Sequence, residues 1–226
     1  MSRRLAVILG VLVALLLAGH GHAAVTEAVK RNNVGADFLK QNKHEEAIAE
    51  FQRAIEVDPS YVAAHFNLAY ALECAKRFDE AIAQYERALQ LRPDDVFGLN
   101  NLGVLYTNKR RYDEAIKVLE QAAKIEPSNS TVSKNLENAR QNKSILQERG
   151  ARIAEARKQV EARPQDSGVA YNLARVYASL DMIDEAFEWL GKALKLGFDN
   201  IEFVREDPVL LGLKKDPRFA AMLEGK

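Results

Sequence analysis

The apolar residues of this chain recur at steps of three and four over most of its length, which is the period of an amphipathic helix. One stretch, "DEAIAQYERALQLRP" at 79–93, has close copies at 45–59 and 113–127. The three copies begin 34 residues apart, so the chain contains an internal repeat. The pattern therefore predicts several similar helical units rather than one irregular domain.

Each repeat is expected to form two closely packed helices, because small and large residues alternate at fixed places within it. Aligning the copies superposes the small residues Ala47, Ala81 and Ala115, the large residues Phe51, Tyr85 and Leu119, and the prolines Pro59, Pro93 and Pro127. Each proline follows an apolar helix and precedes a serine or an aspartate. It therefore ends one helix and helps to cap the next.

These residues resemble the tetratricopeptide repeat, a 34-residue helix-turn-helix unit. The resemblance covers three consecutive repeats and a fourth, more divergent one, at 28–61, 62–95, 96–129 and 167–200. It implies an all-α fold, a right-handed superhelical solenoid of stacked helix-turn-helix repeats with a C-terminal helical cap at 201–226. Two Asp-Pro pairs, at Asp207 and Asp216, are expected to start short helices in that cap.

The glycine that the family places in the turn of each repeat is missing. The residues at that place are Asn42, Lys76, Arg110 and Asp181. Asparagine and aspartate tolerate a left-handed backbone, whereas lysine and arginine should cost some stability there.

The segment 130–166 is either a degenerate repeat or a helical linker. Apolar residues recur every seven positions along it, at Val132, Ala139, Leu146, Ile153 and Val160. The signature alanines are absent, so the segment could form a hairpin or one long helix. We expect two helices with a turn at Gly150, because a glycine inside a continuous helix costs about 1 kcal/mol relative to alanine.

The N-terminus has the layout of a secretory signal peptide. Arg3 and Arg4 precede an unbroken apolar run, and small residues follow it, which predicts cleavage after Ala23. The run is shorter than the roughly 20 residues that a spanning helix needs. We expect residues 1–23 to direct export to the periplasm, with release outside the cell as the alternative. Contact with a membrane is expected only through an uncleaved signal segment.

The composition and motifs indicate no enzyme and no nucleic-acid binder. The chain has 32 basic and 32 acidic side chains, without the basic excess of nucleic-acid binders. Its single cysteine, Cys74, excludes a multi-cysteine metal site. His44 and His65 take places that the family often gives to aromatic residues, so packing is their expected role. We predict no catalytic residue, no cofactor, no metal site and no small-molecule substrate.

Function is therefore expected on the concave surface of repeats one to three, which their first helices line and which we call the trough. Asparagines hold the same place in all four repeats, at Asn33, Asn67, Asn101 and Asn172. In the family, asparagines at this place contact the backbone of a ligand, although they could instead bond only to the neighbouring helix. The aromatic residues Phe66, Tyr70 and Phe97 are expected to form a floor that anchors apolar side chains. The candidate partner-binding residues are Asn32, Asn33, Phe66, Asn67, Tyr70, Phe97, Asn100, Asn101 and Val104.

Chaperone-binding members of the family clamp a C-terminal carboxylate with cations that this chain lacks. The corresponding places hold Asn32, Ala36, Asn67, Phe97 and Asn101, so no carboxylate clamp is expected. The resemblance implies a non-catalytic adaptor or scaffold that binds a protein or peptide partner, as a peptide or partner helix in the trough. The alternative is a structural subunit of an envelope or secretion assembly that docks through its convex face and the central helical segment.

Overall fold

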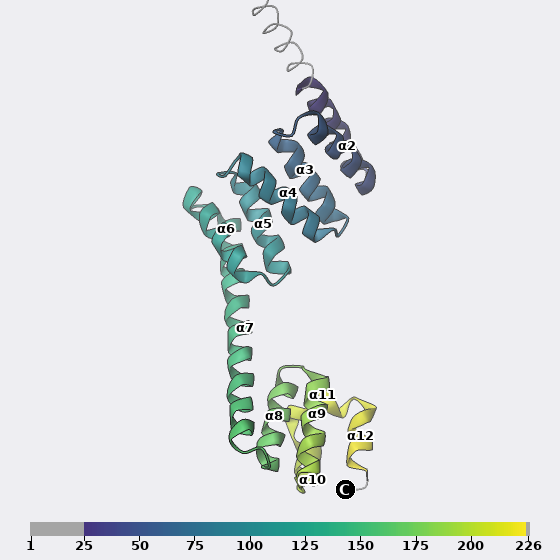
Figure 1. Ribbon diagram of the computed structural model, residues 1–226, viewed down its shortest axis with the longest axis vertical. Coiled ribbons are helices and arrows are strands. Elements are labelled where there is room, and N and C mark those ends of the chain that lie inside the picture. Colours follow the sequence, from purple (N-terminus) through teal and green to yellow (C-terminus); the bar gives the residue numbers. More distant parts are fainter. Residues whose placement is uncertain (1–24, 225–226) are drawn as a thin grey trace, which may run out of the picture. The chain divides into compact units, whose positions relative to one another are not determined.

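The computed structural model describes residues 25–224, and all regular structure in that range is helical, as expected from the repeat. The expected signal segment, residues 1–23, lies outside the described residues. The first helix described covers residues 25–40. It is followed by α2 (His44–Val57), α3 (Val62–Cys74), α4 (Phe78–Leu91), α5 (Val96–Asn108), α6 (Tyr112–Ile125), α7 (Ser130–Ala162), α8 (Ser167–Ser179), α9 (Ile183–Lys195), α10 (Ile201–Glu206), the 3-10 helix η1 (Pro208–Leu210), α11 (Leu211–Lys214) and α12 (Pro217–Leu223) (Figure 1).

The chain divides into two compact units, unit 1 up to Gln141 and unit 2 from Asn142. In unit 1 consecutive helices pair into hairpins, most extensively α3 with α4 and α5 with α6. The helices of each pair approach closely because small residues face large ones. A Cβ atom added at Gly35 would lie 2.7 Å from Cε1 of Phe51, and one at Gly103 would lie 2.4 Å from Cγ of Leu119. Glycine at these two places therefore sets the spacing of the helices.

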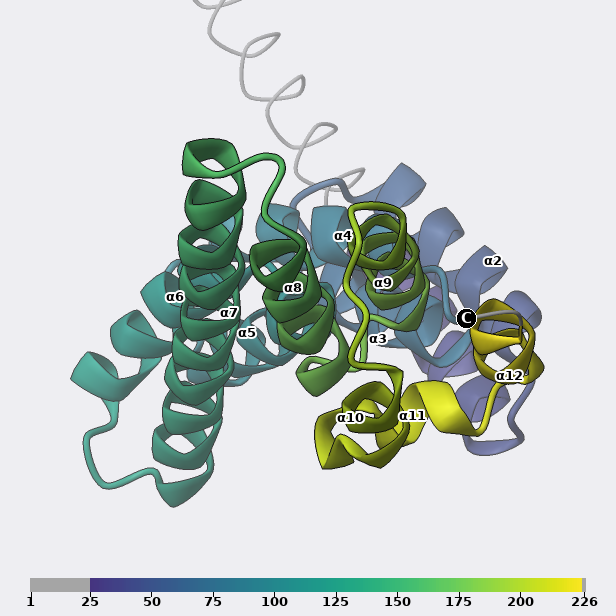
Figure 2. The same cartoon turned by 90° about the horizontal axis from the view of Figure 1, so that it is seen from below.

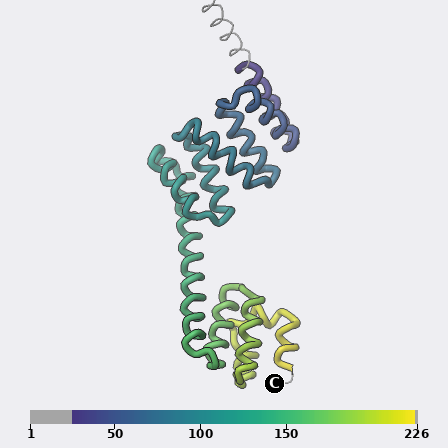
Figure 3. Tube along the Cα trace, in the orientation of Figure 1, coloured from purple at the N-terminus to yellow at the C-terminus, as the bar shows by residue number. Residues whose placement is uncertain are grey.

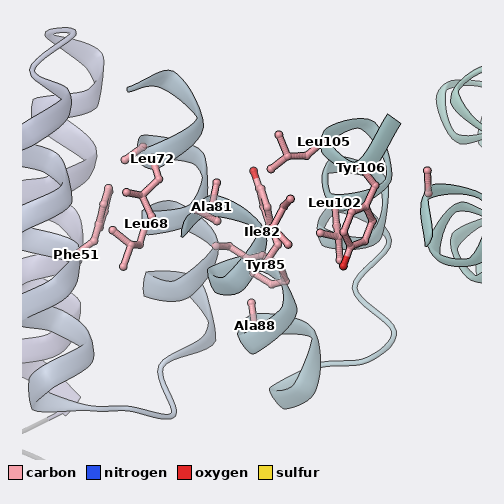
Figure 4. Close-up of a cluster of buried hydrophobic side chains, with 14 of the residues drawn as sticks. Phe51, Leu68, Leu72, Ala81, Ile82, Tyr85, Ala88, Leu102, Leu105 and Tyr106 are labelled. Atoms are coloured by element: carbon pink, nitrogen blue, oxygen red, sulfur yellow. The ribbon is translucent and has the colours of Figure 1, made fainter. Parts of the chain in front are cut away.

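The core of unit 1 consists of the repeat's signature residues. Figure 4 shows Phe51, Tyr85 and their neighbours stacked between successive helices. Phe51, Tyr85, Leu119 and the alanines aligned with Ala81 have no exposed surface. Each hairpin cannot bury this apolar face alone, which explains why the pattern repeats.

The turns of the hairpins have the left-handed backbone that was expected at the place of the missing glycines. Asn42, Lys76, Arg110 and Asp181 have φ of +58°, +61°, +59° and +59°. In each case the backbone N–H of the next residue bonds back to the fifth residue before it, as Arg77 N does to Leu72 O at 2.8 Å. The hydrogen-bond geometry of the turn therefore requires a positive φ at this residue, whichever side chain it carries.

The expectation of two helices in 130–166 is wrong. Residues Ser130–Ala162 form one continuous helix, α7, in which Gly150 is an ordinary helical residue (Figure 3). Strong helix formers such as Gln147, Arg149 and Ala151 surround Gly150, so its cost of about 1 kcal/mol does not end the helix. Of the apolar residues spaced by seven, Val132 is buried in unit 1 and Ile153 packs in unit 2, whereas Leu146 between them is exposed.

Unit 2 contains the α8–α9 hairpin and the C-terminal cap. The two helices lie side by side (Figure 2), and their core includes Leu173, Tyr177 and Leu190. Asp207 and Asp216 start η1 and α12 as expected, each accepting a backbone N–H at 2.9 Å beside a proline. These elements cover the end of the hairpin with four buried apolar residues, Leu210, Leu213, Phe219 and Leu223.

Candidate functional site

The two central helices of the trough of unit 1 carry no cation. Neither α3 nor α5 contains a lysine or an arginine. On the preceding helix, Arg31 is directed at carboxylates, with Nε 2.7 Å from Glu27 and Nη1 3.2 Å from Glu50. Apart from the half-buried carboxyl group of Glu73, α3 and α5 offer a ligand amides, aromatic rings and small apolar side chains.

Two aromatic side chains of the expected floor are exposed. Phe97 on α5 keeps 65% of its surface and Tyr70 on α3 keeps 50%. Val104, two turns after Phe97 on α5, is half-buried, as is Cys74, which is one turn after Tyr70 on α3. The Cys74 side chain raises the pKa of Tyr70 above its ordinary value of 10.0. The phenol is neutral at physiological pH with or without this shift and can donate a hydrogen bond.

The third aromatic residue of the expected floor, Phe66, is not exposed. It keeps 9% of its surface and packs against Tyr85, with the ring centroids 6.4 Å apart. A Cβ atom at Gly98 of the next repeat would lie 2.2 Å from Cε1 of Phe66. The missing side chain at Gly98 leaves the space that Phe66 fills, so Phe66 packs between two repeats and has little exposed surface.

The asparagines are divided between internal bonds and exposed positions. Asn32 is buried and accepts a bond of 2.8 Å from Nδ2 of Asn67, on the next repeat. Asn100 accepts the equivalent bond, also 2.8 Å, from Nδ2 of Asn135 on α7. Asn33 is exposed. The amides of Asn67 and Asn100 thus link neighbouring helices, while part of each side chain still faces solvent.

Asn101 belongs to a small polar network below the trough. Tyr85 is fully buried and its O–H donates to Glu73 Oε2 at 3.4 Å. Burial raises the pKa of Tyr85, and a hydrogen bond from Asn101 opposes that shift. Burial also raises the pKa of Glu73, partly offset by the bond from Tyr85. The network fixes Asn101 at the surface of the trough.

Among residues 25–224, no group of three or more His, Cys, Asp or Glu side chains could hold a metal ion. His65 is buried, with Nδ1 2.8 Å from Gln84 Oε1 and Nε2 3.0 Å from the Pro59 carbonyl, so it takes part in packing. The described helices include none that is long and apolar enough to cross a membrane.

The sequence reasoning missed a second concave site, in unit 2. A groove of about 630 Å³ lies between α7, α8 and η1, and its walls include Arg152, Gln159, Arg175 and Val209. Asn172, the exposed fourth member of the asparagine set, also lines it. The sequence does contain an indication of this groove. When the repeats are aligned on their prolines, Arg152 and Gln159 replace alanines that are buried in the other repeats.

Comparison with protein-family models matches the chain to the tetratricopeptide repeat at residues 35–96, 75–138 and 168–200, which together are more than half of it. Comparison with curated protein sequences gave no significant match.

Several solved structures share the fold. The first TPR of Spaghetti (RPAP3), bound to the HSP90 peptide SRMEEVD, is 24% identical with a TM-score of 0.51, over 53% of this chain and 94% of that one. The second TPR domain of human RPAP3, in complex with the HSP70 peptide SGPTIEEVD, is 23% identical with a TM-score of 0.50, over 52% and 98%. MamA from Desulfovibrio magneticus RS-1, residue 41 to its end, is 20% identical with a TM-score of 0.50, over 75% and 94%.

The family matches coincide with helix pairs whose small and large residues interlock and whose turns adopt one backbone conformation. The solved structures repeat the same helix-turn-helix packing. The chain belongs to the tetratricopeptide repeat family.

Proposed function

We propose that the protein is a non-catalytic adaptor that holds a peptide or a partner helix in the trough of unit 1. The exposure of Phe97 and Tyr70 carries the proposal. Large aromatic side chains are costly to leave in water, and they are the commonest anchors of protein interfaces. Asn67 and Asn101 lie beside them and offer donors and acceptors to a peptide backbone.

The proposed ligand differs in charge from the peptides bound by two of the similar structures. Those peptides end in EEVD, which carries carboxylates. Here α3 and α5 have no cation to pair with them. We therefore propose a ligand segment that is apolar and uncharged where it contacts Phe97 and Tyr70.

A displayed peptide library tests this proposal. Peptides selected on the purified protein are measured against three forms: the parent, the double variant Tyr70→Ala/Phe97→Ala, and the control Phe78→Ala. Phe78 is an exposed aromatic residue at the start of α4, on the second helix of its repeat. We expect the double variant to lose binding at least roughly tenfold, as anchor residues do, while the control keeps it. Equal binding by all three forms would reject the trough as the site.

We also propose that the protein is of the exported bacterial type and acts in the periplasm. The support is the sequence of residues 1–23, with its arginines, short apolar run and small residues before Ala24. N-terminal sequencing of protein from fractionated cells tests it, and an intact N-terminus in the cytoplasmic fraction would contradict it.

The alternative, docking of the convex face in a larger assembly, is favoured by one feature of unit 1. A cavity of about 400 Å³ opens between α4, α5 and α6, and Leu89, Leu99 and Val118 are among its apolar lining residues. A partner bound there would be insensitive to Tyr70→Ala/Phe97→Ala. The substitution Val118→Asp would release that partner and leave peptide binding unchanged.

A further inference from the structure

The groove of unit 2 lies beside a place where the repeat has lost a large side chain. In the ordinary repeats the residue eight places before the proline is large and fully buried, as Phe51, Tyr85 and Leu119 are. Eight places before Pro164 the chain has Ala156, which lines the groove. The missing bulk leaves open space beside α7 that the other repeats fill with a side chain.

The groove follows α7 for about four turns. A second cavity of about 390 Å³, lined in part by Ile145, shares Arg152 and Ser179 with the first cavity of about 630 Å³. Gln159 is the last residue of α7 that lines the first cavity. The rise along the helix from Ile145 to Gln159 is about 20 Å, the length of an extended chain of about six residues. Arg152 stands midway, seven residues from each of these ends.

Two arginine side chains of α7 reach across the groove to α8. Nη2 of Arg152 donates to Oγ of Ser179 at 2.9 Å, and Nη2 of Arg149 donates to the carbonyl oxygen of Leu180 at 2.8 Å. Both acceptors are uncharged, and neither arginine forms an ion pair with another described residue. Each guanidinium group has five N–H donors, so both keep donors and a positive charge for a ligand.

A third arginine, Arg175, is held in the groove by a buried carboxylate. Its Nε lies 2.8 Å from Oδ2 of Asp207, which is itself held by the O–H of Tyr171 and the backbone N–H of Val209 at 2.7 and 2.9 Å. Asp207 is 2% exposed, whereas the Arg175 side chain keeps 37% of its surface and lines the groove. Arg175 has the place in α8 that Tyr70 has in the trough, nine residues into the helix.

The carboxylates near the groove are directed along α7 and not across it. Glu148 accepts a bond of 3.2 Å from Ser144, and Glu155 accepts one of 3.3 Å from Gln159. Each partner is four residues away on the same helix, so these bonds do not lead toward α8. The charged groups that extend across the middle of the groove are therefore arginines, which favour a carboxylate there.

Apolar side chains lie on both sides of Arg152. Ile145, which keeps 54% of its surface, and Leu180 line the second cavity. Val176 and Val209 line the first cavity and are only half-buried. The groove thus presents an apolar surface, a cationic centre and a further apolar surface in order along α7.

We propose that the groove of unit 2 is a second binding site, for an extended segment of a partner protein that has an acidic side chain at its centre and apolar side chains on either side. The carboxylate pairs with Arg152, and Arg149 and Arg175 lie near it. Because the groove continues on both sides of Arg152, the carboxylate belongs to a side chain within the segment and not to a chain end. The amides of Gln159 and Asn172 at one end suit the unpaired backbone groups of an extended chain.

Peptides selected from a displayed random library test this proposal on the whole protein. The selection uses the variant Tyr70→Ala/Phe97→Ala, so that binding in the trough of unit 1 does not dominate it. We expect the selected peptides to contain aspartate or glutamate between apolar residues. Arg152→Gln should weaken their binding roughly tenfold, because a charge-assisted pair is lost. The matched control is Arg157→Gln, which should leave binding unchanged. Arg157 is also on α7 and donates to the hydroxyl of Tyr177 at 2.9 Å, but it is not among the residues that line the groove.

A charge exchange separates recognition from a structural role of Arg152. Arg152→Glu should bind a selected peptide better when lysine replaces its acidic residue, whereas the parent protein should prefer the acidic form. A residue that only supported the fold would weaken both peptides equally. Peptides with an amidated C-terminus should bind as well as those with a free carboxylate, because the acidic side chain is the recognised group.

Three results would overturn the proposal. They are a selection that yields no binder, peptides that bind the parent and Arg152→Gln equally, and binding that requires the free C-terminal carboxylate. Circular dichroism and the fluorescence of Trp189, the single tryptophan, confirm that each variant is folded, so a loss of binding is not mistaken for unfolding. Tyr70 and Phe97 are not part of this groove, so each of these results leaves the proposal for the trough unchanged.

Discussion

The turn residue Lys76 offers a direct test of the energetics of this fold. Its φ of +61° lies in the left-handed region of the backbone, which costs an L-residue with a Cβ atom about 1–2 kcal/mol. Glycine has no Cβ and avoids this cost, but it loses more freedom on folding, which costs about 0.4–1 kcal/mol. Lys76→Gly should therefore raise the free energy of unfolding of unit 1 by up to about 1.5 kcal/mol.

The neighbouring repeat supplies a matched control. Asn42 has the same φ within a few degrees, but asparagine tolerates this conformation. Asn42→Gly should therefore raise the free energy of unfolding clearly less than Lys76→Gly does. Lys76→Ala keeps the Cβ and should gain nothing. Urea unfolding followed by circular dichroism measures the midpoint and slope for each variant. Equal gains for Lys76→Gly and Asn42→Gly, or a loss for Lys76→Gly, would refute the argument from backbone strain.

Four further predictions follow from particular contacts. Gly98→Ala should destabilise unit 1 by about 1–3 kcal/mol in urea unfolding, because its Cβ would overlap Phe66. Gly150→Ala should stabilise the protein by about 1 kcal/mol in the same measurement, because a Cβ there meets nothing within 4 Å. Asp207→Ala removes the acceptor of Tyr171 O–H at 2.7 Å and the ion pair with Arg175 at 2.8 Å, so unit 2, followed by Trp189 fluorescence, should lose about 2–4 kcal/mol. The raised pKa of Glu73 makes its contribution to stability greatest below its ordinary value of 4.5 and smaller as pH rises through the folded pKa, so Glu73→Gln should compare more favourably with the parent at about pH 7 than at about pH 4.

The features that could be predicted from the sequence are those that depend on a residue and its immediate neighbours. The left-handed turns follow from the fixed place of Asn42 and Lys76 between two helical patterns. The Asp-Pro starts follow because an aspartate side chain at the N-cap bonds to the backbone two residues later, as at Asp207 and Asp216. The buried signature residues follow from the small and large alternation.

The orientation of Phe66 could not be predicted in this way. Phe66 and Phe97 are both aromatic residues on first helices, and the sequence suggests that both face the trough. Whether Phe66 does so depends on Gly98, 32 residues later, since the lack of a Cβ there opens the space between the repeats. A property of the neighbouring helix decided the outcome, and no pattern within one repeat contains it.

Whether residues 130–162 form a hairpin or one continuous helix depends on the difference in free energy between the two complete structures. A hairpin in the 34-residue register of the other repeats needs a left-handed residue at Ser144, 34 residues after Arg110, and that residue would cost about 1–2 kcal/mol. The other repeats recover this cost by packing fully buried alanines between their helices. A closed hairpin here would instead bury Arg152 and Gln159, whose desolvation is unfavourable without partners.

The continuous helix costs only about 1 kcal/mol at Gly150 and keeps these polar side chains at the surface. The loss of the turn and the loss of the alanines are thus two parts of one change, in which the repeat no longer closes within the chain.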